Sequence, residues 1–150
     1  MDHEALAALV PELMKAHPDI DWKFIETNEC FALEIRPISD PGRLAEVYVS
    51  ESTEMFWYVF AGHEARQFAY ETPEKREVLE EQLAGAVAAV RGPTQVLLDW
   101  AGDDVVRSGI SHNVDGEDPE APTVDWLPKR IWWWMQGRQL RREILKFPAI

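Results

Sequence analysis

The chain has 150 residues, of which 46% are hydrophobic and 28% charged, and its formal net charge is −12. This length suits one domain, residues 1–150, and the composition excludes a globally disordered chain. The only cysteine, Cys30, excludes an intramolecular disulfide and any zinc site built from several cysteines.

A helix is predicted at the N-terminus. Asp2 can accept hydrogen bonds from the first-turn amides, and apolar residues from Leu6 to Met14 recur on one helical face. The pattern ends near His17, and Pro11 predicts a kink or a restart within it. The first residues carry acid where a secretory signal carries Lys or Arg, and no apolar run approaches the roughly 20 residues of a spanning helix. We therefore expect a cytoplasmic protein that contacts no membrane.

From Asp21 the hydrophobic period changes to two, which indicates strands. Turn residues recur at short intervals, and short connections favour an antiparallel meander. Phe31, Leu33 and Ile35 alternate with smaller or polar residues, so the sheet should have one buried face and one solvated face. The five predicted strands are 22–26, 31–36, 45–50, 55–60 and 65–71.

A second helix and a hairpin follow the meander. Thr72, Pro73 and Glu74 predict a helix start with a hydroxyl cap, and Gly92 predicts its end. Two further strands, 96–100 and 105–110, flank turn residues and predict a hairpin. Residues 113–122 hold four acids and little apolar bulk, so we expect a solvated loop.

A final helix is predicted from about residue 125 to residue 146, because Trp126, Trp133, Leu140 and Phe147 recur every seven residues. The predicted fold class is therefore α+β, with an antiparallel sheet of about five to seven strands packed against N-terminal, central and C-terminal helices. The order of elements resembles the type III secretion chaperone-like architecture, in which a helix-backed sheet docks another protein. This resemblance rests on element order and implies a binding function.

Sequence motifs for catalysis and cofactor binding fail on inspection. His63 and Glu64 begin like a zinc-protease helix, but the second histidine is missing. The acidic loop lacks the glycine spacing of a calcium-binding loop, and the glycine patterns of phosphate and dinucleotide sites are absent. We expect no cofactor and no metal, and the sequence identifies no catalytic residue.

Charge is spread unevenly along the chain. From Lys129 onward six basic residues face one acid, a local charge of +5, so the first 128 residues carry −17. Trp132 and Trp134 lie about 100 degrees to either side of Trp133 on the predicted helix, so at least one should be exposed. Three interpretations of this helix remain open: internal packing, a protein contact, or binding to a membrane surface or nucleic acid.

Two functional hypotheses follow from these patterns. The first is a small acidic protein-binding module, such as a bacterial immunity protein that neutralises a toxin or a secretion chaperone. Its partner would be a basic protein, possibly a nuclease, and not nucleic acid, since acid repels phosphate. The alternative is an α+β enzyme or small-ligand-binding protein with a pocket near Trp57, Tyr58, Trp100 or His112. The candidate partner-binding residues are Glu51, Glu54, Asp115, Glu117, Asp118, Glu120, Trp132 and Trp134.

Overall fold

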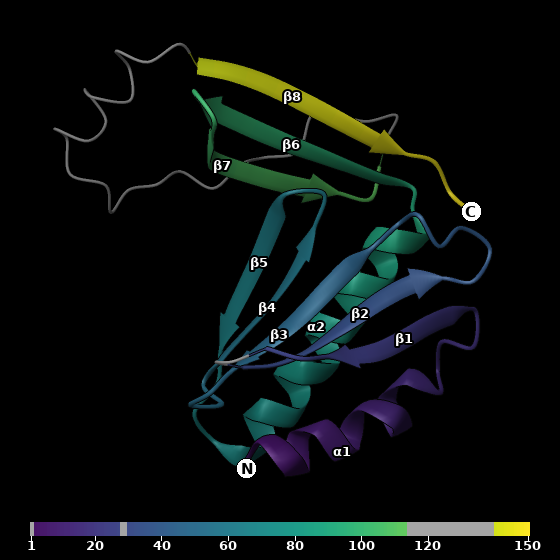
Figure 1. The fold of residues 1–150 in the computed structure, drawn as a ribbon, viewed down its shortest axis with the longest axis vertical. Coiled ribbons are helices and arrows are strands. Elements are labelled where there is room, and N and C mark those ends of the chain that lie inside the picture. Colours follow the sequence, from purple (N-terminus) through teal and green to yellow (C-terminus); the bar gives the residue numbers. More distant parts are fainter. Residues whose placement is uncertain (1, 28–29, 114–139) are drawn as a thin grey trace, which may run out of the picture. The chain divides into compact units, whose positions relative to one another are not determined.

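The computed structural model describes residues 2–27, 30–113 and 140–150. The chain divides into two compact units, which are drawn together in Figure 1. The first unit holds Met1–Phe60 and Glu64–Gly92 together with Ile150, and the second holds Ala61–His63 and Pro93–Ala149. The fold class is α+β, as predicted, with two antiparallel sheets and two helices among the described residues.

The N-terminal helix begins where its cap predicts. Helix α1 spans His3–Met14, and the Asp2 carboxylate accepts a hydrogen bond of 2.9 Å from the Ala5 amide. Pro11 lies inside this one continuous helix, so the predicted restart at Pro11 is wrong. Leu6, Val10 and Met14 are buried, which confirms the predicted apolar face.

The first unit contains a five-stranded antiparallel meander, in the order β1-β2-β3-β4-β5. All five predicted strands are present, with β3 and β4 at the predicted bounds. A two-residue turn at Ala61 and Gly62, with φ of 50° and 87°, joins β4 to β5 and has the backbone of a type I′ hairpin turn. The strands are β1 (Ile20–Ile25), β2 (Cys30–Pro37), β3 (Ala45–Ser50), β4 (Met55–Phe60) and β5 (His63–Phe68).

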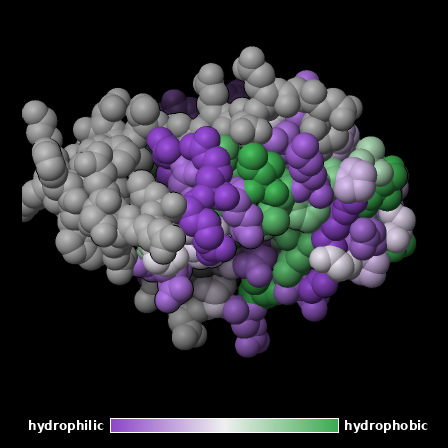
Figure 2. Space-filling view, turned by 90° about the horizontal axis from the view of Figure 1, so that it is seen from above, coloured by the Kyte–Doolittle hydropathy of each residue, from purple (hydrophilic) through white to green (hydrophobic). Residues whose placement is uncertain are grey.

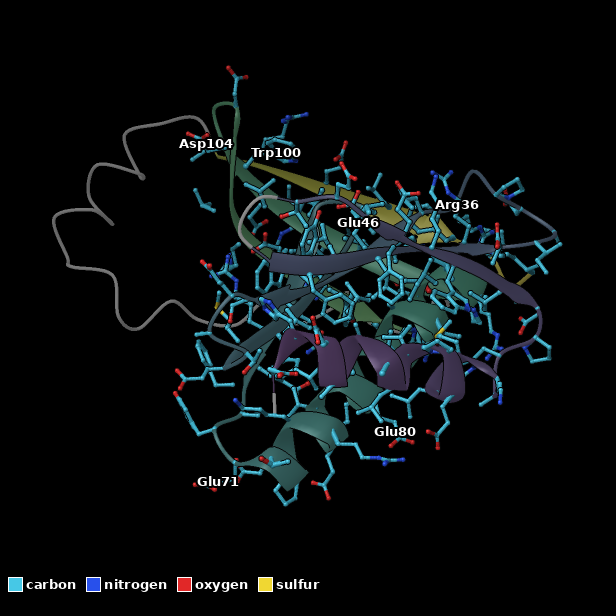
Figure 3. All side chains as sticks on the ribbon, turned by 60° about the horizontal axis from the view of Figure 1, so that its bottom comes forward. Arg36, Glu46, Glu71, Glu80, Trp100 and Asp104 are labelled. Carbon is cyan, nitrogen blue, oxygen red and sulfur yellow. The ribbon has the colours of Figure 1, made fainter. Side chains whose placement is uncertain are left out.

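The two faces of this sheet differ as the alternation predicts. Leu33 lies opposite Val47, which lies opposite Tyr58, and all three side chains are buried on the helix side. Both helices lie on that side, whereas Arg36 and Glu46 project from the other (Figure 3). On the outer face Tyr48 stacks on Trp57, with ring centroids 5.1 Å apart. The core of the first unit therefore lies between the sheet and the helices.

Helix α2 (Thr72–Arg91) covers the sheet, and a glycine lets it approach closely. A Cβ atom at Gly85 would lie 2.8 Å from Cε1 of Tyr58, so the Tyr58 ring occupies the space of the missing side chain. The helix begins one residue earlier than predicted: Glu71, not Thr72, is the N-cap, and Glu74 accepts a 3.4 Å bond from its amide. Gly92 ends the helix with φ of 68°, as predicted.

The second unit is a three-stranded antiparallel sheet in the order β7-β6-β8. Its strands are β6 (Thr94–Ala101), β7 (Asp104–Ser111) and β8 (Leu140–Phe147). The hairpin of β6 and β7 confirms the predicted one. Figure 2, seen from above the view of Figure 1, shows a group of apolar residues with hydrophilic residues on both sides of it.

The predicted C-terminal helix is wrong over residues 140–147, which form β8. Strand β6 is buried along nearly its whole length, and its two edges both carry amides and carbonyls that need partners. Strand β7 supplies partners on one edge, and β8 supplies them on the other through eight residue pairs, from Thr94 with Phe147 to Ala101 with Leu140. Tertiary pairing with β6 therefore overrides the seven-residue apolar period. The rest of the predicted helix lies outside the described residues.

Among the described residues, no helix combines the length and apolar character needed to cross a membrane.

Candidate protein-docking surface

Three segments that are distant in sequence meet at one end of the first unit. The imidazole of His3 lies 2.8 Å from the carbonyl oxygen of Ser50, which joins the start of α1 to the turn between β3 and β4. The Ala69 amide donates a 2.9 Å bond to the Glu54 carbonyl, which joins the same turn to the segment before α2. These two contacts place the starts of both helices around residues 51–54.

This region, which we call the acidic end, carries six exposed carboxylates. Both helix N-termini favour negative charge, which explains why acids are tolerated here at high density. Glu74 also serves the helix itself, since it accepts bonds of 3.4 Å from the amides of Tyr70 and Glu71. The acidic end consists of Asp2, Glu4, Glu51, Glu54, Glu71 and Glu74.

The one lysine within these three segments points inward. Lys75 is only 7% exposed, and its Nζ donates a 2.8 Å hydrogen bond to the Thr53 hydroxyl. Thr53 itself has φ of 59°, a left-handed conformation that a threonine rarely adopts, and the bond to Lys75 helps to hold it there. The lysine thus fixes the turn that carries Glu51 and Glu54, while the acids remain on the surface.

The surface at the acidic end is hollowed. An open depression of about 450 Å³ is lined by Asp2, His3, Glu4, Glu51, Ser52 and Thr53. Its lining combines carboxylates, hydroxyls and an imidazole, groups that accept hydrogen bonds from ammonium and guanidinium ions. The depression therefore has the chemistry to receive a basic side chain.

Two aromatic residues lie exposed beside these acids. Phe68 is 60% exposed and Tyr70 is 64% exposed, and they flank Ala69, whose amide is bonded to Glu54. Protein interfaces typically have aromatic side chains at their centre and charged or polar residues around them. The acidic end thus combines apolar anchors with a negative rim.

Of the predicted partner-binding residues, the structure places Glu51 and Glu54 in the exposed turn between β3 and β4. Asp115, Glu117, Asp118, Glu120, Trp132 and Trp134 lie outside the described residues. The other four acids and both aromatic residues were not predicted as contacts, because segments near residues 3, 52 and 70 meet only in the folded chain. The one available local signal was helix capping, since Asp2 is the N-cap of α1 and Glu74 belongs to the capping box of α2.

The residues named under the enzyme hypothesis lie on different elements of the two units. Tyr58 is buried on the helix side of the sheet, and Trp57 lies on the opposite face against Tyr48. Trp100 belongs to the second unit, where the Arg141 guanidinium lies 5.1 Å from its ring centroid. His112 is exposed. In the described part of the chain, no group of three or more His, Cys, Asp or Glu residues is arranged to hold a metal ion.

Arg142, a basic residue of β8, is engaged within the second unit. Asp99, on β6, accepts hydrogen bonds of 2.7 Å from Arg107 Nε and 2.8 Å from Arg142 Nε, one from each neighbouring strand. The hydrogen bonds from Arg142 and Arg107 hold the pKa of Asp99 below its ordinary value, against the opposing effect of burial. The three residues therefore form a charged row that stabilises the sheet.

Comparisons with protein-family models, with curated proteins and with solved structures found no match to the chain.

Proposed function

We propose that the protein is a binding module that docks a basic protein at its acidic end. The observation that carries the proposal is the convergence of six exposed acids with exposed Phe68 and Tyr70 on one region of the first unit. The net charge of −12 supports it, because a negative surface attracts a basic partner over distances of about 10 Å at 0.1 M salt.

Modules of this kind include immunity proteins that neutralise basic toxins and dedicated secretion chaperones. For an immunity protein, a nuclease toxin is the partner class that the charge favours, since proteins that bind nucleic acid carry basic surfaces. The acids would govern how fast the two proteins meet, and the aromatic residues would govern how slowly they separate.

The experiment compares two triple variants of equal net charge against a partner identified by affinity purification. The test variant, Glu51→Gln with Glu54→Gln and Glu71→Gln, neutralises three acids of the acidic end. It keeps Asp2 and Glu74, which accept hydrogen bonds from helix-start amides, and a glutamine at the N-cap position 71 retains a side-chain oxygen as acceptor. Its association rate at low salt should fall by about tenfold, and by less at high salt. The matched control neutralises three exposed acids elsewhere: Asp21→Asn, Asp103→Asn and Asp104→Asn.

The control should retain an association rate within about twofold of the unmodified protein, because the removed charges lie outside the acidic end. Equal slowing by both variants would show that net charge alone drives association, and it would remove the acidic end as the docking surface. An unchanged rate in both would refute the electrostatic proposal altogether.

A further inference from the structure

Strand β5 leaves one of its edges open. It is the last strand in the order β1-β2-β3-β4-β5, so within the described residues the sheet ends there. The Ala69 amide bonds to the Glu54 carbonyl and therefore points toward β4. Because backbone groups of a strand alternate between its two sides, the amides and carbonyls of Glu64, Arg66 and Phe68 point to the open edge.

The side chains at this edge do not protect it fully. Glu64 and Arg66 form an ion pair of 2.7 Å, and such charges are the usual means of discouraging strand addition. Phe68, however, is 60% exposed at the end of the strand, and Tyr70 follows it at 64%. The backbone groups at this edge can form hydrogen bonds with an added strand, and the aromatic side chain can pack against it.

A row of acids on α2 runs beside the same strand. Glu81 accepts a 2.7 Å bond from the side-chain amide of Gln67 on β5, and Glu74 accepts a 3.4 Å bond from the Tyr70 amide. These two acids are seven residues apart and so lie on one helical face, with Glu77 between them. All three are exposed. The row lies on the helix side of the sheet, because Gln67 faces α2.

The cations near this row already have partners. Arg66 is paired with Glu64, and Lys75 is buried against Thr53. Arg76 lies 3.7 Å from Glu12 on α1. Among the described residues, the helix side of the β5 edge therefore presents acids without a paired cation. The other side presents Phe68 beside the Glu64–Arg66 ion pair, since alternate strand residues point to the same face.

We propose that an extended segment of the partner adds to the edge of β5 as a further strand, with basic and apolar residues in alternation. Its basic side chains would face Glu74, Glu77 and Glu81, and its apolar side chains would lie over Phe68. This inference rests on the proposed function, and it specifies the partner segment as an extended chain with a two-residue period. Main-chain bonds to Glu64, Arg66 and Phe68 supply affinity, and the alternation supplies specificity.

The test uses a synthetic dodecapeptide of alternating Lys and Val, with a peptide of the same composition in two blocks as the control. Amide hydrogen exchange of the full chain is followed by nuclear magnetic resonance. Saturating alternating peptide should slow exchange at Glu64, Arg66 and Phe68 by about tenfold or more, because those amides gain partners. Ala65 and Gln67, whose amides point toward β4 by the same alternation, should change little.

Two neighbouring single variants test the acidic row. Glu81→Gln should weaken binding of the alternating peptide about threefold, whereas Glu80→Gln should leave it unchanged. Glu80 is a matched control because it projects from α2 away from the sheet (Figure 3). Phe68→Ser should weaken binding about tenfold without loss of folding, since its side chain is exposed.

The outcomes separate this inference from the proposed function. If the alternating peptide binds while exchange at Glu64, Arg66 and Phe68 stays unchanged, strand addition is refuted, and docking of a basic chain at the acidic end survives. Absence of binding at 1 mM peptide, or equal binding of the block peptide, also refutes strand addition. In that case the proposed function is still tested separately, by the association rates of the two triple variants.

Discussion

Asp99 and Arg142 stand opposite each other on β6 and β8, and the Arg142 guanidinium holds the Asp99 carboxylate through bonds of 2.8 Å and 3.2 Å. Arg107 on β7 donates a 2.7 Å hydrogen bond to the same carboxylate from the opposite neighbouring strand. One acid therefore ties together all three strands of the second unit. The Asp99 side chain is 11% exposed, so these bonds are partly shielded from water.

The first prediction concerns Asp99 and pH. Its pKa is lowered in the folded chain, chiefly by the hydrogen bond from Arg142, so the ionised form is the one that folding favours. Its contribution to the free energy of unfolding should be complete above about pH 4 and should fall as pH drops through the lowered pKa. Asp99→Asn should cost about 2 kcal/mol at pH 7 and abolish this part of the acid dependence.

Denaturant unfolding between pH 2 and pH 7, followed through amide signals of β6, measures both effects. Asp103→Asn is the control, because Asp103 is exposed at the turn beyond β6. A pH profile that is identical for Asp99→Asn and the unmodified protein would contradict the assigned role of this carboxylate.

The second prediction concerns Gly85 and Tyr58. Alanine favours a helix over glycine by about 1 kcal/mol, yet the new Cβ of Gly85→Ala would lie 2.8 Å from the buried Tyr58 ring. Overpacking costs about 1 to 3 kcal/mol, so the melting temperature should fall despite the better propensity. In a Tyr58→Leu background the same change should raise the melting temperature. If Gly85→Ala raised the melting temperature in both backgrounds, the Tyr58 ring would have moved aside without loss of stability, which would contradict this prediction.

Local patterns predicted the elements whose neighbours are close in sequence. The alternation of Val47 and Val49 gave β3 its correct bounds, and Asp2 marked the start of α1, because each signal acts within a few residues. The segment 140–147 was misread because Ile144 and Leu145 fit both a helical stripe and a strand. Only the need of β6 for a partner on its second edge decides between them, and β6 lies some 40 residues earlier.

The candidate site was predictable only in part, for the same reason. Glu51 and Glu54 stand in a turn whose exposure follows from its composition. Their proximity to Asp2 and Tyr70 depends on the contacts of His3 with Ser50 and of Ala69 with Glu54, which no local pattern encodes.

The third prediction concerns removal of β8. Truncation at Thr123 should unfold the second unit, because the shortened chain leaves one edge of β6 without its partner strand. Amides of Val96 and Leu98 should then exchange at least tenfold faster, and the melting transition should broaden or disappear. A truncated chain with native exchange rates along β6 would show that β8 is dispensable.

The fourth prediction is that the protein binds no duplex DNA or RNA tighter than about 1 μM at physiological salt. The net charge is −12, and binding to phosphates depends on free cations. On β8, Arg142 is committed to Asp99, and Arg141 lies over Trp100. Electrophoretic shift assays at 50 mM and 150 mM salt should show no complex. A salt-dependent complex below 1 μM would reverse the assignment of partner class.

The last prediction separates the two groups of acids that the sequence proposed as contacts. Neutralising Asp115, Glu117, Asp118 and Glu120 removes four charges from a segment with little apolar bulk, so the melting temperature should hardly change. If the loop shares in docking, the association rate with the basic partner should fall about tenfold at low salt, as for the acidic end. Combining the loop variant with the Glu51, Glu54 and Glu71 variant should then slow association further. An unchanged rate for the loop variant at every salt concentration would confine docking to the acidic end, whereas a loss seen only in dissociation would indicate a buried contact rather than a steering charge.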